Sequence, residues 1–324
     1  MVAIETALTR LLGIAHPILL APMGSAAGGK LAAAVTNAGG LGLIGSGYAD
    51  AATIKKELAA AGNTRVGVGF ITWALDKNPE ALDVALAAQP PAVMISFGEP
   101  RPYVRPIKDA GAKLICQVQT LAEAVAAAAA GADIIVAQGR DAGGHSGTTR
   151  GSMGLVPAVV NAVGTIPVVA AGGIADGRGF AAALALGAAG VLMGTRFAAS
   201  AESLWAEAMK QHLIAAGGDE TEQTRVFDIV RNAPWPTKYP GRAVRNAFSA
   251  RWHPSEDRLR DNRAEVETEY LATPADDFST RVVWAGEGVD LIRDVKTAEE
   301  IVNLTVAEAV SELDRCSALV RRSG

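Results

Sequence analysis

A histidine between glycines, directly after a predicted strand, is the residue of this sequence best suited to chemistry. It lies in AQGRDAGGHSG, residues 137–147, which continues the apolar run IIVA. A histidine side chain exchanges protons near neutral pH, and neighbouring glycines allow the backbone to approach a ligand closely. The other three histidines lie before the first predicted strand, in a predicted helix and in a charged segment. We therefore expect His145 to be the catalytic residue.

Two glycine-rich turns form a second signal, in PVVAAGGIADGRG and GVLMGTRF. Gly172-Gly173 and Gly194-Thr195 each end a predicted strand and lead towards a helix start. The N–H groups and positive dipole end of a helix start favour a phosphate. Either turn alone is equally compatible with a tight bend and no ligand. As a pair on the seventh and eighth strands, they predict a phosphate site.

A third signal is APMG, which ends the first predicted strand. Ala21, Pro22 and Met23 present backbone towards something flat, and the thioether of Met23 is polarisable enough to contact an aromatic ring. This evidence is weak by itself. Because no G-x-G-x-x-G leads from a strand into a helix, we expect no dinucleotide-binding domain.

The elements that position these motifs are short apolar runs separated by alanine-rich helical segments. Strands that are apolar throughout and alternate with amphipathic helices predict a parallel sheet covered by helices, and eight strands suffice for a (β/α)₈ TIM barrel. The predicted strands are residues 17–22, 41–45, 65–71, 92–96, 113–118, 133–137, 167–171 and 190–194. The predicted helices are residues 29–38, 50–61, 79–88, 101–110, 120–130, 156–163, 177–186 and 201–215.

The composition changes after residue 216. Prolines and tryptophans cluster in APWPTKYPGR, charges dominate HPSEDRLRDNRAEVETE, and the chain ends in an amphipathic helical pattern. We expect residues 1–216 to form the barrel. We expect residues 217–324 to form a mostly helical C-terminal extension that packs on the barrel and covers the active site.

Composition narrows the class of protein. A chain of 324 residues with 49% hydrophobic residues and a formal net charge of −4 is typical of a globular protein without a basic surface for nucleic acid. The two cysteines match no metal-ligand spacing, and we expect no metal. With no targeting signal and no long uncharged apolar segment, the sequence predicts a soluble cytoplasmic protein that binds no membrane.

These motifs resemble the FMN-dependent nitronate monooxygenases, formerly called 2-nitropropane dioxygenases. The matching elements, in the family's order, are APMGSAAGGKLAAAVTNAGGLGLIG, AQGRDAGGHSG, PVVAAGGIADGRGFAAALALGAAGVLMGTRF, GRAVRNAF and VVWAGEGVDLI. They touch most of the chain. Where some family members carry a tyrosine and a lysine near the active site, this sequence has Trp284 and Glu287.

The resemblance implies a set of FMN-binding residues. It places the phosphate at the two glycine-rich turns, the ring along APM, and Gln117 at the flavin's polar edge. The implied residues are Ala21, Pro22, Met23, Gln117, Gly144, Ala171, Gly172, Gly173, Gly194 and Thr195.

The resemblance also implies the reaction, the oxidation of alkyl nitronates by O₂ to a carbonyl compound and nitrite. His145 matches the catalytic histidine, either as the base that deprotonates a neutral nitroalkane or as a donor to the nitronate oxygens. Residues expected to line the substrate pocket, unless they are ordinary core residues, are Trp73, Ser96, Phe97, Ser146 and Trp284. A homodimer is a further expectation that no motif determines.

Other functions stay open. FMN-dependent reductases that use NAD(P)H to reduce quinones or enoyl thioesters share the barrel and a glycine-histidine loop, so this loop does not separate them from an oxidase. A flavin-binding protein without catalysis is a less favoured alternative. A flavin-free phosphate-sugar isomerase or lyase is a further alternative, but such an enzyme would not need the flat backbone of the APM motif. An inosinate-type dehydrogenase needs a cysteine after strand six, whereas Cys116 is predicted inside a strand.

Overall fold

The computed structural model describes residues 3–147 and 149–320, and at its centre eight parallel strands form a barrel. Their order is β1-β9-β8-β6-β5-β4-β3-β2, and a bridge between Leu19 and Leu41 closes the ring. Each strand overlaps a predicted one, which confirms the (β/α)₈ fold. The strands are β1 (Ile18–Leu20), β2 (Leu43–Gly45), β3 (Gly67–Ile71), β4 (Ala92–Ser96), β5 (Lys113–Val118), β6 (Ile134–Gln138), β8 (Val168–Ala171) and β9 (Gly190–Met193).

The strands are apolar at almost every position because both of their faces are buried. Leu43, Met94, Ile115 and Val136 belong to a core inside the barrel. Their neighbours along the chain, such as Ile44, point outward into a larger core under the helices. Side chains alternate between the two faces of a strand, so each strand contributes to both cores.

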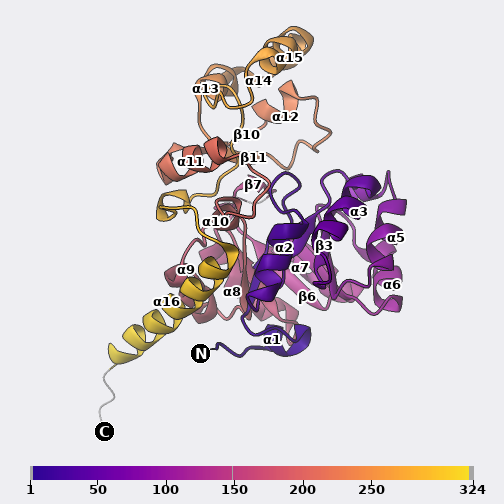
Figure 1. Cartoon of the computed structure of the whole chain (residues 1–324), viewed down its shortest axis with the longest axis vertical. Helices are drawn as coiled ribbons and strands as arrows, with labels where there is room; N and C mark the ends of the chain where they lie inside the picture. Colours follow the sequence, from indigo (N-terminus) through magenta and orange to yellow (C-terminus); the bar gives the residue numbers. More distant parts are fainter. Residues whose placement is uncertain (1–2, 148, 321–324) are drawn as a thin grey trace.

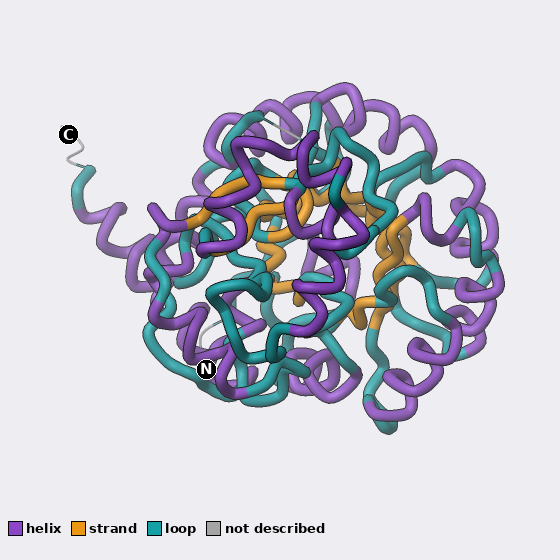
Figure 2. Tube along the Cα trace, turned by 90° about the horizontal axis from the view of Figure 1, so that it is seen from above, coloured by secondary structure: helices purple, strands orange, loops and turns teal. Residues whose placement is uncertain are grey.

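Helices surround the strands, as Figure 2 shows from above. The alanine-rich segment after β5 is one of them: Thr120 and Glu123 form a capping box at its start, and Gly131 ends it with φ of 102°. The helices on the barrel are α2 (Gly29–Asn37), α3 (Ala51–Ala60), α4 (Thr72–Leu75), α5 (Glu80–Ala87), α6 (Arg101–Asp109), α7 (Leu121–Ala130), α8 (Ser152–Val163) and α9 (Gly177–Ala185). A short helix, α1 (Ala7–Leu12), precedes β1.

The structure differs from the prediction of a barrel helix at residues 201–215. A single turn, α10 (Thr195–Ala198), follows β9, and α11 (Glu207–Ala215) packs near the short helix η3 (Val289–Leu291) above the barrel. The place beside α9 and α2 is taken by the C-terminal helix α16 (Ala298–Ala318), which Figure 1 shows in yellow. None of the described helices, α16 included, is long and apolar enough to cross a membrane.

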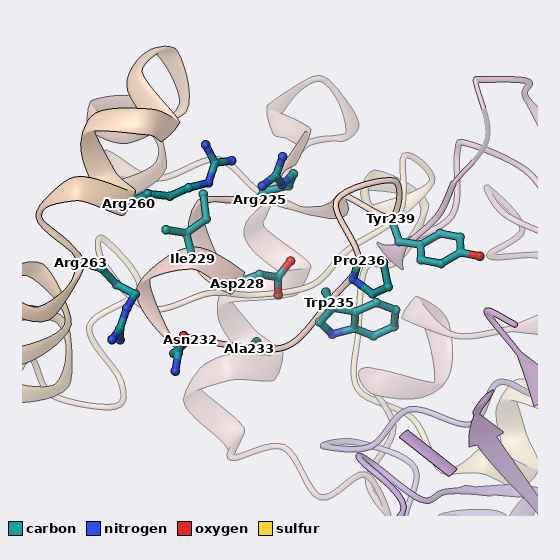
Figure 3. A pocket seen from close by; sticks show the side chains of 10 residues that line it. All are labelled: Arg225, Asp228, Ile229, Asn232, Ala233, Trp235, Pro236, Tyr239, Arg260 and Arg263. Carbon is teal, nitrogen blue, oxygen red and sulfur yellow. The ribbon is translucent and has the colours of Figure 1, made fainter. Parts of the chain in front are cut away.

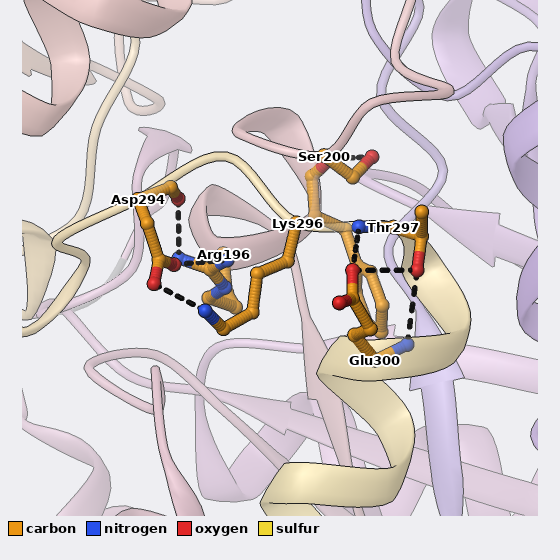
Figure 4. A network of polar contacts seen from close by, with 7 residues as sticks. Arg196, Ser200, Asp294, Lys296, Thr297 and Glu300 are labelled. Atoms are coloured by element: carbon orange, nitrogen blue, oxygen red, sulfur yellow. Dashed lines mark hydrogen bonds and ion pairs between the residues drawn. The ribbon is translucent and has the colours of Figure 1, made fainter.

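A polar network fixes the start of α16 against the end of the barrel (Figure 4). The buried guanidinium group of Arg196 donates to the backbone oxygen of Asp294 at 3.0 Å and to its carboxylate at 3.1 Å. The hydrogen bond from Lys296, followed by the charge of Arg196, lowers the pKa of Asp294. Thr297 and Glu300 then form the capping box of the helix. The chain leaves the barrel after β9, and this network brings it back to the barrel as α16.

Residues 217–297 lie over one end of the barrel, at the top of Figure 1. They include η1 (Gly218–Glu220), α12 (Val226–Val230), α13 (Ala247–Trp252), η2 (His253–Ser255), α14 (Glu256–Asp261) and α15 (Arg263–Ala272). Phe227, Phe248, Trp252 and Tyr270 belong to a small core of this layer. The division of the chain at residue 216 stays a prediction, and α16 shares its buried residues with the core of the barrel.

We predict that α16 contributes to the stability of the barrel through its buried face. Ile301 is 2% exposed in the barrel core, so Ile301→Ala should lower the free energy of unfolding by about 2–5 kcal/mol. Leu304, on the same helix and 43% exposed, provides the matched control, and Leu304→Ala should cost no more than about 0.5 kcal/mol. Urea denaturation measures both values. Equal losses in the two variants would contradict this packing.

Candidate active site

A cavity of about 490 Å³ opens at the carboxyl ends of the barrel strands, below the layer formed by residues 217–297. Its volume lies within the range of roughly 300–1,000 Å³ typical of small-molecule and cofactor sites. In barrels of this kind the active site forms at the same end of the strands. The cavity is therefore the candidate active site.

Fourteen of the predicted site residues line this cavity, although they come from distant parts of the chain. They are Ala21, Pro22, Met23, Ser96, Phe97, Gln117, Gly144, His145, Ala171, Gly172, Gly173, Gly194, Thr195 and Trp284. Trp73 and Ser146 lie outside the cavity wall. The ring of Trp73 packs against Tyr48 and Trp235, and Ser146 is 1% exposed with its N–H bonded to the Pro240 oxygen.

The GGH segment is a strand and not a free loop. Residues Gly144–His145 form β7, which pairs antiparallel with β11 (Gly241–Val244); β11 in turn pairs with β10 (Thr221–Thr224). In this register His145 faces Gly241 and Gly144 faces Arg242. Gly144 has φ of 70°, and a Cβ placed there would meet no atom within 4 Å. The glycine thus exposes bare backbone to the cavity.

A chain of side-chain amides supports β7 from the barrel. The Gln138 amide at the end of β6 donates to the backbone oxygen of His145 at 3.1 Å. Its own oxygen accepts hydrogen bonds from Gln117 and Gln119, each at 3.0 Å. Buried amides of this kind are stable only when they are hydrogen-bonded. The position of His145 is consequently tied to β5 and β6.

The imidazole of His145 is held by a carboxylate from the covering layer. Its Nε2 lies 2.9 Å from an oxygen of Asp228 in α12, and both side chains are at most 10% exposed. The other Asp228 oxygen accepts a hydrogen bond from Arg231 at 3.3 Å. A carboxylate can only accept hydrogen bonds, so we assign the proton of the neutral imidazole to Nε2. Nδ1 is then the nitrogen able to take up a proton.

Aromatic rings cover the imidazole. The ring of Trp235 stacks on His145 with centroids 3.5 Å apart and planes 6° from parallel, and Trp284 lies 5.1 Å away. Phe97 touches the edge of Trp235. These rings exclude water from one side of the imidazole, which strengthens its electrostatic interaction with Asp228.

Arg242 clamps the segment that carries Trp284. Its buried guanidinium group pairs with Glu287 at 2.7 Å and donates to the Arg140 oxygen and to Thr221. Burial lowers the pKa of Arg242, an effect that the charge of Glu287 opposes. The role of Glu287 in this structure is therefore to pair with the buried Arg242.

Asp141 does not orient His145. One oxygen of its carboxylate accepts from the Ser152 N–H at 3.1 Å and from the Ser152 hydroxyl at 2.5 Å. Its backbone oxygen accepts from the N–H of Glu287. Asp141 thus tightens the base of its own loop.

The glycine pair after β8 lines the cavity. Gly172 and Gly173 have φ of 112° and 67°, and within the described residues neither N–H donates to a protein acceptor. The expectation that the following helix contributes its N-terminus is wrong. Asp176 accepts from the first turn of α9, and Glu308 accepts from the Gly177 N–H at 2.9 Å. Only the turn itself can bind a phosphate there.

Four further residues belong to the site and were not predicted from the sequence: Asp228, Arg231, Trp235 and Gln138. Gln138 lies in the stretch that contains His145, and its place at a strand end was an available signal. Asp228 is 83 residues away from His145. An acid inside the apolar pentapeptide VFDIV is the one sequence feature that marks it.

The remaining candidate nucleophile and histidines lie elsewhere. Burial raises the pKa of the Cys116 thiol in β5 to about 12, which leaves it protonated at neutral pH. This excludes it as the thiolate of an inosinate-type reaction. Burial lowers the pKa of His16 and of His212, and neither residue lines the cavity.

A family model for nitronate monooxygenase matches residues 5–65 and 51–308. A nitronate monooxygenase from Neurospora crassa is 33% identical over 94% of this chain and 92% of its own length. A protein from Rhodococcus jostii named (3aS,4S,5R,7aS)-5-hydroxy-7a-methyl-1-oxo-octahydro-1H-indene-4-carboxyl-CoA dehydrogenase is 36% identical over 70% of this chain. That match spans 65% of the Rhodococcus protein.

Two solved structures are similar in fold and sequence. FabK from Thermotoga maritima aligns with a TM-score of 0.85 at 32% identity, covering 98% of this chain and all of that one. Nitroalkane oxidase from Streptomyces ansochromogenes aligns with a TM-score of 0.78 at 29% identity, covering 96% and 100%. The family match extends through the barrel and the covering layer that supplies Asp228. The chain therefore belongs to the nitronate monooxygenase family of flavin-dependent oxidoreductases.

Proposed function

We propose that the protein binds FMN and oxidises alkyl nitronates with O₂ to a carbonyl compound and nitrite. The observation that carries this proposal is the His145–Asp228 pair at the wall of a flavin-sized cavity. The nitroalkane oxidase similarity supports the same class of substrate. The pair can also extend the reaction to neutral nitroalkanes, because these must lose an α-proton before oxidation.

The cavity fits FMN at both ends. Unpaired N–H groups of Gly172 and Gly173 suit a phosphate, which backbone turns of this kind bind well. At the other end, Pro22, Met23 and Gly144 leave flat surfaces for the ring, and Gln117 offers an amide to its polar edge. We propose these residues, with Ala21, Ala171, Gly194 and Thr195, as the FMN site.

In the mechanism, His145 acts as the proton acceptor. Asp228 holds Nε2–H, so Nδ1 takes the α-proton of a nitroalkane and the carboxylate stabilises the resulting imidazolium. FMN held by these residues would supply the electron-accepting chemistry of the oxidation. For a substrate that arrives as the nitronate, the protonated imidazole instead donates a hydrogen bond to its oxygens. The surrounding tryptophans keep water away from this exchange.

A substitution at the phosphate turn tests the cofactor site. Gly172→Ala introduces a Cβ that would lie 2.3 Å from the Asp141 carboxylate at a φ of 112°, so the turn must shift. We expect the FMN-to-protein ratio after desalting to fall by about tenfold or more, as phosphate contacts are lost.

Gly164→Ala is the matched control, since Gly164 has φ of 65° but its added Cβ meets nothing within 4 Å. This variant should retain FMN. A Gly172→Ala protein with full flavin content would show that the turn does not hold the cofactor.

A second experiment tests the proton acceptor. His145→Ala and Asp228→Asn should both retain FMN and lose turnover of neutral nitroethane by about a hundredfold or more, the usual contribution of a general base. An asparagine can donate to Nε2, which moves the proton to Nδ1 and removes the base. Turnover of pre-formed ethyl nitronate should fall much less.

The control for Asp228→Asn is Asp276→Asn, because Asp276 is exposed in the covering layer. Steady-state oxygen uptake with both substrates measures the effect. Full nitroethane turnover in His145→Ala would eliminate the base role.

A reductase is the second candidate function. The similarity to FabK covers nearly the whole chain, and the Rhodococcus relative carries the name of a dehydrogenase that acts on a coenzyme A derivative. Such a reaction would use the same flavin cavity with a nicotinamide or a thioester as the other reactant. His145 and Asp228 would then act as a proton donor pair.

A further inference from the structure

A second cavity, of about 190 Å³, lies in the covering layer on the far side of Trp235. It is formed by α12, by the proline-rich segment after α12, and by α14 and α15, as Figure 3 shows. Trp235 lines both this cavity and the flavin cavity. Asp228, which holds His145, lies in its wall. The two cavities are thus adjacent at the catalytic pair.

The wall of this second cavity is rich in arginine. Arg225, Arg260 and Arg263 come from three different helical segments, and their side chains are 26%, 37% and 33% exposed. In Figure 3 Arg225 and Arg260 point to the same side and Arg263 points away from them, and Trp235 lies between the arginine-bearing helices and the barrel. Among the described residues that line the cavity, Asp228 is the single acid. Its carboxylate is already bonded to His145 and Arg231.

The three guanidinium groups keep donors available. Glu256 pairs with Arg225 and Arg260, Asp257 with Arg260, and Glu267 with Arg263. These ion pairs use at most two of the five N–H donors that each guanidinium group carries. The acids hold the arginines in place from outside the cavity wall. The remaining donors can form the paired hydrogen bonds that guanidinium groups make with phosphate.

The size of the cavity limits what it can hold. A volume of about 190 Å³ is below the range of roughly 300–1,000 Å³ for a complete ligand of drug size. It suffices for one or two phosphate groups. The flavin cavity begins at the other side of Trp235, so this ring forms a shared wall between the two cavities.

We propose that this arginine pocket, lined by Arg225, Arg260 and Arg263, binds the diphosphate-bearing tail of a reactant whose reactive end enters the flavin cavity. Coenzyme A thioesters and NADPH share this chemistry, because both carry a phosphorylated adenosine diphosphate. The inference rests on the proposed function only in taking the flavin cavity as the reaction site. It deepens the second candidate function, the reductase, by predicting an extended, anionic reactant.

Calorimetric titration of the FMN-loaded protein at low salt tests the pocket. The probes are coenzyme A, NADPH and inorganic pyrophosphate, measured without turnover. In the double variant Arg260→Met with Arg263→Met, binding should weaken by about tenfold or more, because charge-assisted hydrogen bonds are lost. The matched control is Arg258→Met, whose side chain is exposed on the same helix as Arg260 and lies outside the pocket. It should bind all probes as the wild type does.

The probes distinguish the sources of the diphosphate tail. If only coenzyme A shows arginine-dependent binding, the reactant is a thioester. If only NADPH does, the reactant is the reductant. Arginine-dependent binding of pyrophosphate, in either case, shows that the pocket recognises the diphosphate that both molecules share. The proposal is overturned when no probe binds the wild type, or when the double variant binds the probes as tightly as Arg258→Met does. Oxygen uptake with propyl nitronate reports separately on the proposed function, because this substrate has no tail.

Discussion

The site depends on the antiparallel pairing of two residues, Gly144 and His145, with Gly241 and Arg242. This pairing joins the loop after the sixth barrel strand to a layer that lies about 100 residues later in the chain. It positions His145 and brings Asp228 and Trp235 to it in the same step. A backbone hydrogen bond contributes only about 0.5–1.5 kcal/mol net, so a pairing this short needs support from its surroundings.

That support comes from buried polar side chains that form hydrogen bonds and ion pairs with other groups of the protein. Gln138 fixes the His145 backbone from the barrel, and Arg242 fixes the far side through Glu287 and the Arg140 oxygen. Removing one partner of such a network leaves the other buried and unpaired, which costs more than the bond itself contributes. The histidine is therefore held in one position, as the base role proposed for it would require. Rigidity here comes from long-range contacts and not from the glycine-rich loop.

Much of the barrel could be predicted from sequence for a simple reason. A strand buried on both faces must be apolar throughout, and the sequence marks Ile134–Gln138 and its seven counterparts in this way. The glycine turns were equally visible, since a φ of 112° at Gly172 requires glycine. Most of the predicted site residues lie together because strand ends meet at one end of a barrel.

The remainder depends on contacts that no local pattern encodes. The amphipathic pattern of α16 predicts a helix but not that it replaces α11 beside α9 and α2. Asp228 and Trp235 reach His145 only through the β7–β11 register, which involves two residues of β7. The acids that cap α9 are likewise ordinary in sequence, and Glu308 reaches Gly177 across 131 positions.

We propose that the His145–Asp228 pair presents a nitronate to a flavin in the barrel mouth. Anaerobic rapid mixing of the FMN-loaded protein with propyl nitronate tests it most directly, with NADH and NADPH mixed in parallel. We expect the nitronate to bleach the visible absorbance of the flavin within the time of a single turnover, and readmitted O₂ to restore it. A flavin that stays oxidised with propyl nitronate but is bleached by NADH or NADPH would contradict the account and identify a reductase.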